Sequence, residues 1–103
     1  MDKRFKLYYS HLFYNDLDKI TDYILYELKN FEAANNLISD VEESIKRRLM
    51  NPVSMAPYKS IKEREYPYRR IIIGNYLIFY VVIDDKMIVR RILYGKSEID
   101  KIL

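Results

Sequence analysis

The chain has 103 residues, of which 50% are hydrophobic and 32% are charged, and it contains no cysteine. This composition is typical of one soluble globular domain spanning residues 1–103, and the lack of thiols excludes disulfides and thiolate metal sites. No apolar run approaches the roughly 20 residues that a membrane-spanning helix needs. No signal peptide precedes the first predicted strand, so we expect a cytoplasmic protein without membrane contact.

The net charge of +3 is unevenly distributed along the chain. Residues 1–50 carry 8 Lys and Arg against 9 Asp and Glu, whereas residues 51–103 carry 10 against 6. A basic second half is consistent with an anionic partner, either nucleic acid or an acidic protein segment. An ordinary lysine-rich surface would give the same balance, so composition leaves both interpretations open.

The first half of the chain predicts a short strand followed by a helical hairpin. Residues 5–9 form the strand, and Ser10 stands where the N-cap of the first helix belongs. Two apolar stripes at helical spacing follow, separated at Asn30, and Pro52 ends the second helix. Glu43 and Arg47 stand four residues apart on the polar side of that helix, in the order that favours an ion pair. The two stripes are Phe13, Leu17, Ile20, Ile24 and Leu28, and then Ala34, Leu37, Ile38, Val41, Ile45 and Leu49.

Residues 66–95 predict three consecutive strands, because β-branched and aromatic residues dominate them. Gly74-Asn75 is a two-residue hairpin signal, and residues 84–86 form a second short polar turn. Ser97 and Asp100 then make a capping box for a short last helix over residues 98–103. Three meandering strands cannot bury one face alone, so the helices must cover it.

These elements predict an α+β fold in which a two-helix hairpin packs on one face of a small, mainly antiparallel four-stranded sheet. The expected order is β-α-α-β-β-β-α. The opposite sheet face, with the basic loop of residues 51–65, is expected to be the exposed functional surface. The expected core comprises Leu17, Ile20, Ile24, Val41, Ile45, Ile78 and Val82.

Two arginine pairs in the strands, Arg69-Arg70 and Arg90-Arg91, are the sharpest functional signal. Neighbouring residues of a strand point to opposite faces, so one arginine of each pair should face away from the helices. The other must lie beyond the helices or pair with a carboxylate, because an unpaired buried guanidinium is too costly. Together with Lys96 and the loop residues Lys59, Lys62 and Arg64, the outward arginines would form a basic patch suited to phosphate. Structural ion pairs with acidic residues of the helices are the alternative.

The remaining polar residues predict no metal ion and no cofactor. His11 is the only histidine, and one imidazole without thiolates cannot form a multi-ligand metal site. The chain has two glycines, so phosphate-cradling glycine motifs are absent. Tyr76 and Tyr80 fit packing positions in the central strand. Tyr68 and Tyr94 flank arginines, where a tyrosine could stack on a base or transfer a proton.

The order of these elements, together with short strand motifs, resembles the RelE/ParE superfamily of toxins from type II toxin–antitoxin (plasmid stabilisation) modules. The resemblance covers nearly the whole chain. It implies a growth-arresting toxin that a cognate antitoxin neutralises. The motifs are Asp16-Leu17 in the first helix, Tyr68-Arg69-Arg70, Gly74-Asn75-Tyr76, Ile78-Phe79-Tyr80, and Arg91 to Lys96 in the strands.

The resemblance leaves the target open between two branches of the superfamily. ParE-like toxins inhibit DNA gyrase, whereas RelE-like toxins cleave messenger RNA on the ribosome. If the chain is a nuclease, the resemblance implies that the catalytic residues are Arg69, Arg70, Arg91 and Tyr94. In either branch the residues that bind nucleic acid or another target would be Lys59, Lys62, Arg64, Arg90 and Lys96.

Three positions at which RelE-like nucleases keep catalytic groups hold Leu77, Ser97 and Leu103 in this chain. Losing one charge-stabilising group typically costs several kcal/mol of transition-state stabilisation. The balance therefore favours a ParE-like gyrase inhibitor slightly over a ribosome-dependent endonuclease with an altered site. A non-toxic RNA-binding module and an inactive toxin relic are the remaining alternatives.

Overall fold

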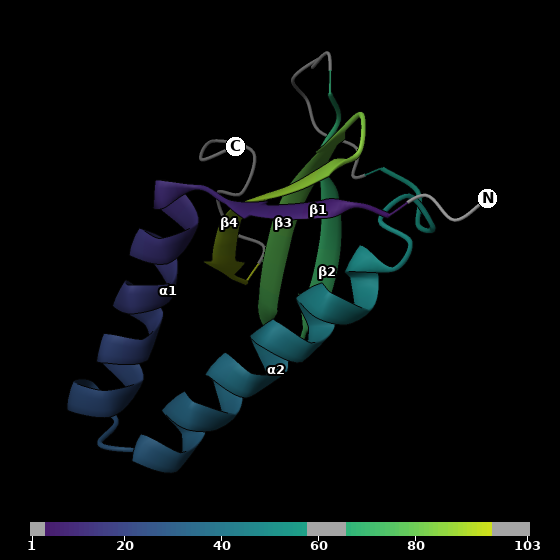
Figure 1. Ribbon diagram of the computed structural model, residues 1–103. Coiled ribbons are helices and arrows are strands. Elements are labelled where there is room, and N and C mark those ends of the chain that lie inside the picture. Colours follow the sequence, from purple (N-terminus) through teal and green to yellow (C-terminus); the bar gives the residue numbers. More distant parts are fainter. Residues whose placement is uncertain (1–3, 58–65, 96–103) are drawn as a thin grey trace.

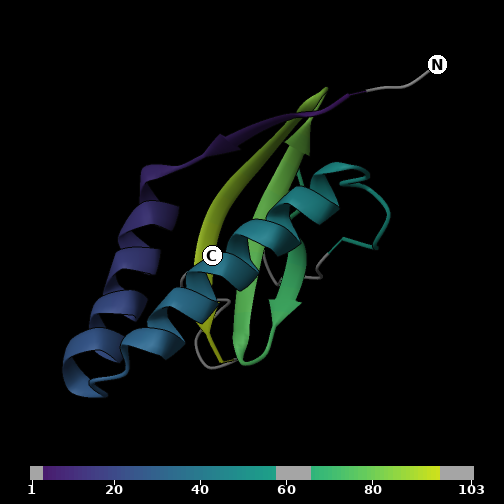
Figure 2. The same ribbon diagram turned by 60° about the horizontal axis from the view of Figure 1, so that its bottom comes forward.

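The computed structural model describes residues 4–57 and 66–95. Two helices lie against one face of a four-stranded sheet, which confirms the predicted α+β architecture (Figures 1 and 2). The predicted last helix, residues 98–103, lies outside the described residues, as do Lys59, Lys62, Arg64 and Lys96. The elements in chain order are β1 (Lys6–Tyr9), α1 (His11–Asp22), the π-helical turn η1 (Tyr23–Glu27), α2 (Phe31–Leu49), β2 (Arg69–Ile73), β3 (Tyr76–Ile83) and β4 (Lys86–Tyr94).

The strand order in the sheet is β1-β4-β3-β2, with the three C-terminal strands antiparallel as predicted. Gly74 and Asp84, the first residues of the two turns, both have a φ of 55°, the left-handed backbone that a tight hairpin requires. β1 pairs in parallel with β4. A parallel neighbour needs a long connection, and the helical hairpin with the meander provides it.

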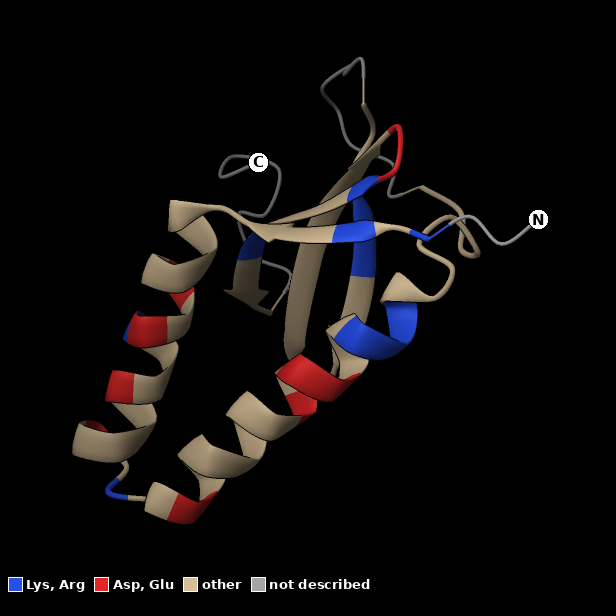
Figure 3. Ribbon diagram, viewed as in Figure 1, with Lys and Arg blue, Asp and Glu red and all other residues tan. Residues whose placement is uncertain are grey.

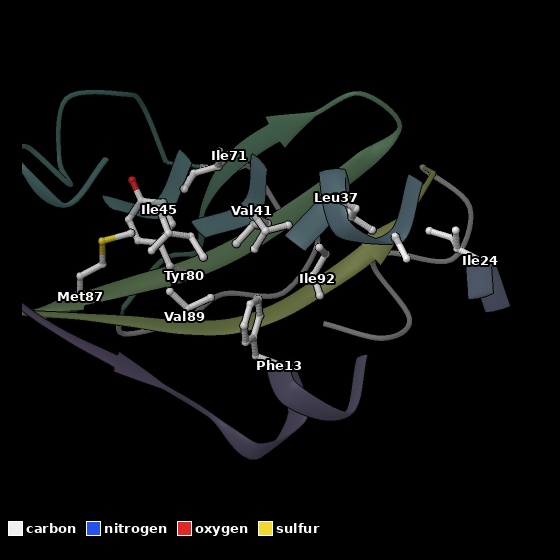
Figure 4. Packing of buried hydrophobic residues seen from close by; sticks show 12 residues of the cluster. Phe13, Ile24, Leu37, Val41, Ile45, Ile71, Tyr80, Met87, Val89 and Ile92 are labelled. Atoms are coloured by element: carbon white, nitrogen blue, oxygen red, sulfur yellow. The ribbon is translucent and has the colours of Figure 1, made fainter. Parts of the chain in front are cut away.

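The main core lies between the helices and the sheet, as Figure 4 shows. Of the predicted core residues, Ile24, Val41, Ile45 and Ile78 are buried. Leu17, Ile20 and Val82 are partly buried and pack against the same cluster. The core prediction is therefore confirmed in its membership, with the partly exposed residues at its margin.

The end of the first helix departs from the predicted stripe at Leu28, whose side chain is 56% exposed. The amide of Leu28 donates to the carbonyl of Tyr23, five residues earlier, so the last turn is π-helical. A turn of this width moves the next residue out of phase with the α-helical stripe. Asn30 then begins the second helix, since its side chain accepts a 2.9 Å hydrogen bond from the amide of Ala33.

The sheet face opposite the helices carries a second, smaller cluster. Phe79 is fully buried there and Leu77 is 8% exposed, with Tyr68 and Leu93 packed against them. The expectation of an open functional surface is therefore wrong for the centre of this face. The residues of this face are more exposed toward the edge of the sheet, where Ile72 on β2 is 63% exposed.

Candidate functional site

A β-bulge at Arg90 decides where the second arginine pair lies. In the register of β3 with β4, Phe79 faces Arg91 and Tyr80 faces Val89, so Arg90 is the extra residue. Val89 belongs to the main core, and without the bulge Arg91 would share its face. The extra residue instead puts Arg91 on the opposite face beside Phe79 and returns Ile92 to the core.

Ser10 holds the bulge to the start of α1. Its Oγ donates a 2.7 Å hydrogen bond to the carbonyl of Arg90 and accepts one of 3.3 Å from the amide of Phe13. The predicted N-cap is therefore confirmed, and the same hydroxyl also anchors the irregular strand. The Nε atom of Arg90 is buried and finds no hydrogen-bond partner in the described part of the chain.

Arg91 is engaged by Asp16 of α1 through a two-pronged ion pair. Nε of Arg91 lies 2.6 Å from Oδ2 and one Nη lies 2.9 Å from Oδ1, while the amide of Ile92 donates to Oδ2 at 3.2 Å. The two side chains are only 18% and 11% exposed. The hydrogen bonds that Arg91 donates to Asp16 raise the pKa of Arg91, against the opposing effect of burial. Arg91 is thus a charged structural partner of α1, as the ion-pair alternative predicted.

Arg70 and Arg91 share the sheet face that the helices leave. Both face Phe79 in the register, Arg70 from β2 and Arg91 from β4. Two strand spacings separate them, which corresponds to about 10 Å between Cα atoms. The ring of Tyr68 contacts Phe79 edge-on at 6.1 Å between centroids. Arg70 and Arg91 therefore lie in one row on this face, on either side of Phe79.

Arg69 and Tyr94 lie on the other face, on the side of the helices. Arg69 faces Tyr80 and Tyr94 faces Tyr76, and both β3 tyrosines belong to the main core. Four residues of β3 separate these two positions, or about 13 Å along the strand. Arg69 donates to the carbonyl of Met55, while Tyr94 is 65% exposed with its ring against Tyr76. The four candidate catalytic residues are therefore divided between two faces.

A groove runs between the C-terminal end of α2, the loop that follows it, and β2. Arg48 lines this groove, and one of its Nη atoms donates at 3.0 Å both to the carbonyl of Arg70 and to the hydroxyl of Tyr80. That hydroxyl in turn donates a 2.6 Å hydrogen bond to the carbonyl of Pro52. Figure 3 shows basic segments at the end of α2 and on β2.

The sequence analysis did not predict that Arg47 and Arg48 line this groove. Arg47 lines the groove as an exposed residue, and the structure records no ion pair between it and Glu43. The predicted helix-surface pair is therefore not formed. The run Lys46-Arg47-Arg48 directly before the helix-ending Asn51-Pro52 was the available signal, since it concentrates charge where a helix meets a loop.

No group of three or more His, Cys, Asp and Glu side chains among the described residues is placed to hold a metal ion. None of the helices within residues 4–57 and 66–95 is long and apolar enough to cross a membrane.

Solved structures share this architecture. The chromosomal ParDE toxin–antitoxin system of P. aeruginosa matches with a TM-score of 0.73 and 19% identity, over 91% of this chain and 99% of that chain. A copper-bound mutant toxin from Helicobacter pylori matches with a TM-score of 0.51 and 22% identity, over 92% and 98%. The RelB–RelE antitoxin–toxin complex from Methanococcus jannaschii gives 0.49 and 28%, over 93% and 99%. The P. aeruginosa match shows that this chain and that one share a fold.

The family model described as the ParE toxin of the type II toxin–antitoxin system parDE matches residues 7–99. The chain therefore belongs to the ParE toxin family. A search of curated proteins gives no match.

Proposed function

We propose that this toxin arrests growth in the cytoplasm by acting on DNA gyrase, without cleaving RNA, and that a cognate antitoxin neutralises it. The observation that carries the proposal is the division of Arg69, Arg70, Arg91 and Tyr94 between the two faces of the sheet. Membership of the ParE family supports the toxin role, and the P. aeruginosa relative is itself a toxin–antitoxin system.

A ribonuclease must bring its proton-transfer groups and its charge-stabilising groups to one phosphate. Proton transfer needs heavy-atom approaches of about 2.6–3.2 Å, and stabilising donors must lie at similar distances. Two guanidinium nitrogens of Arg91 donate hydrogen bonds to Asp16, and the guanidinium of Arg69 donates to the carbonyl of Met55. Tyr94 lies across the sheet from Arg70 and Arg91, so these groups are not arranged to contact a common phosphate.

Leu77 also disfavours a nuclease. The resemblance placed a nuclease arginine at this position, which lies on the same face as Arg70 and Arg91. Here the leucine side chain is 8% exposed and packs in the small cluster with Phe79. The position therefore contributes to packing and offers no charge to a developing phosphate oxyanion.

The test is pulse labelling of DNA and protein synthesis in the first minutes after the toxin is induced. We expect DNA synthesis to fall first, a DNA-damage response to follow, and messenger RNAs to stay intact. An early fall in protein synthesis with cut messages would contradict the proposal and establish a ribosome-dependent endonuclease. Unimpaired growth would contradict the toxin role itself. The remaining alternatives would then be a non-toxic RNA-binding module and an inactive toxin relic.

The antitoxin part of the proposal is tested separately by co-expression. The product of a short acidic reading frame adjacent to this gene should relieve the growth arrest and co-purify with the chain. An unrelated acidic protein expressed at the same level serves as the control. Arrest that persists in the presence of the neighbouring product would contradict neutralisation by that partner.

A further inference from the structure

The turn that joins the two helices exposes large apolar side chains. Tyr23 and Leu28 are each 56% exposed. Tyr26 is 71% exposed and Phe31 is 70% exposed. These residues belong to η1, to the link that follows it and to the start of α2, and we call residues 22–32 the hairpin tip. Figures 1 and 2 both place the tip at one end of the molecule, where the two helices meet. Single exposed apolar residues are normal on a protein surface, but several on one short turn indicate a surface that another molecule covers.

The backbone of the hairpin tip is irregular in a way that produces this exposure. Leu28 stands four residues after the buried Ile24, so a continuous α-helix would bring both onto the buried stripe. The hydrogen bond from the amide of Leu28 to the carbonyl of Tyr23 closes a π-turn in its place, and Lys29 then adopts a φ of 50°. A lysine in the left-handed region is uncommon, and both π-turns and unfavourable backbone conformations concentrate at functional sites. The tip is therefore held in a form that presents Leu28 outward.

The charge of the hairpin tip restricts what can cover it. Asp22, Glu27 and Glu32 are exposed, and Lys29 is the basic residue of the tip. In the part of the chain that the structure describes, none of these carboxylates forms an ion pair. The whole hairpin extends the negative charge, because residues 11–43 contain eight Asp and Glu against two Lys and Arg. Figure 3 shows acidic segments on both helices. An apolar patch in such surroundings favours a basic occupant.

We propose that the hairpin tip is a docking surface for a partner protein whose own surface offers an apolar site rimmed by lysine and arginine. Tyr26 and Phe31 would be the central contacts, because aromatic rings bury a large area and are enriched in interfaces. The exposed carboxylates of the tip would pair with the basic rim of the partner.

The same carboxylates disfavour the other occupants. Nucleic acid and anionic membranes would be repelled, and two tips of this chain would bring like charges together. An acidic antitoxin is disfavoured for the same reason. If the proposed function holds, the partner is therefore the target of the toxin. That identification rests on the proposed function, whereas binding of a basic, apolar protein surface does not.

The first measurement titrates the full chain with a blocked amphipathic helical peptide of Leu and Lys and follows the backbone amides by NMR. We expect the largest shifts at residues 22–32. The matched controls are the same peptide with Glu in place of Lys and the same peptide with Ser in place of Leu. Equal binding of the Leu-Glu peptide, or shifts confined to residues outside the tip, would overturn the proposal. Dimerisation of the free chain through the tip would also overturn it and assign the tip to a second copy.

Two variant pairs then locate the binding. Phe31→Ser should raise the Kd of the Leu-Lys peptide at least about tenfold, since it removes an aromatic contact. Leu12→Ser, an apolar-to-serine change at a residue of α1 that is 54% exposed, should change it less than about threefold. Glu27→Lys should raise the Kd about fivefold, whereas Glu43→Lys, at an exposed position of α2 outside the tip, should change it less than about twofold.

The outcomes separate this inference from the proposed function. Equal peptide affinity in Phe31→Ser and Leu12→Ser would overturn the docking surface, whatever the effect on growth. If Phe31→Ser does not fold, the pair Glu27→Lys and Glu43→Lys decides.

Purified DNA gyrase then tests the identity of the partner. We expect the wild type to bind gyrase and a folded Phe31→Ser variant to lose that binding while it still co-purifies with the antitoxin. A wild type that binds the Leu-Lys peptide at its tip but does not bind gyrase would contradict only the proposed function. Gyrase binding that Phe31→Ser leaves unchanged would overturn the assignment of the tip to the target.

Discussion

Asp16 joins the first helix to β4. Its two carboxylate oxygens accept from the Arg91 guanidinium and from the amide of Ile92, at a part of β4 that lies beyond the pairing with β1. The carboxylate thus completes the hydrogen bonding of a strand edge that β1 does not reach. This use of Arg91 removes it from any role that requires a free fork of donors.

We predict that Asp16→Asn destabilises the folded chain by about 2–3 kcal/mol, because it leaves a largely buried guanidinium without its counter-charge. The free energy of unfolding measured in urea checks this. Asp18→Asn, an exposed position on the same helix, is the matched control and should stay within about 0.5 kcal/mol of the wild type. Equal stability of the two variants would contradict a structural role for the pair.

Tyr80 gives a second prediction at the residue scale. Its buried hydroxyl joins Arg48 to the carbonyl of Pro52, which is itself buried. Tyr80→Phe should therefore cost about 1–2 kcal/mol, since it leaves that carbonyl without its donor. Thermal melts monitored by circular dichroism check this against Tyr76→Phe, since the hydroxyl of Tyr76 makes no hydrogen bond within residues 4–57 and 66–95. A larger loss in Tyr76→Phe would show that the hydroxyl of Tyr80 is not the contact that matters.

At the scale of elements, the amphipathic stripes decide how the helical hairpin covers the sheet. α2 buries Ala34, Leu37, Val41 and Ile45 over its length. The first helix contributes fewer fully buried residues, and Leu17 lies at the margin of the cluster. The two helices should therefore respond differently to a charge placed on their stripes.

We predict that Ile45→Asp unfolds the domain, because the carboxylate would be buried without a partner and total stability is only about 5–15 kcal/mol. Leu17→Asp should be destabilised but less severely, since its partly buried position allows the charge to reach water. Ser39→Asp, at an exposed position of α2, is the control. Cooperative melting retained in Ile45→Asp would show that the α2 stripe is misassigned.

At the scale of the whole molecule, the sheet separates two sets of polar residues. Arg70 and Arg91 lie on one face, whereas Arg69 and Tyr94 lie on the other. Tyr94 is 65% exposed, and Arg70 and Arg91 lie on the opposite face of the sheet from it. This separation bears directly on how the toxin can act.

We predict that Tyr94→Phe keeps full growth arrest, because no step of the proposed action uses the hydroxyl. The dose of inducer that halves the growth rate should match that of the wild type at equal protein level, as checked by immunoblot. A nuclease that used Tyr94 for proton transfer would lose about 10²–10⁴-fold in rate. Loss of arrest in a folded Tyr94→Phe variant would therefore count strongly against the gyrase proposal.

Much of the fold could be predicted from the sequence, because its signals are local. Ser10, Gly74 and the apolar stripes act on residues a few positions away, and hydrophobic periodicity alone indicates which helix face is buried. Leu28 escaped prediction because a π-turn is not visible in an α-helical period. The parallel pairing of β1 with β4 escaped it because strand pairing depends on contacts about 80 residues apart.

The sequence by itself determined the helical hairpin, the antiparallel meander and the presence of four arginines in it, since each follows from short-range pattern and side-chain chemistry. Only the tertiary structure decided what those arginines do. The bulge at Arg90 reversed the alternation of β4 and set Arg91 beside Phe79, where Asp16 reaches it. Packing of α2 against β2 brought Arg47 and Arg48 to an open strand edge. Both outcomes depend on the registers of elements distant in sequence, and a one-residue change of register moves a side chain to the other face.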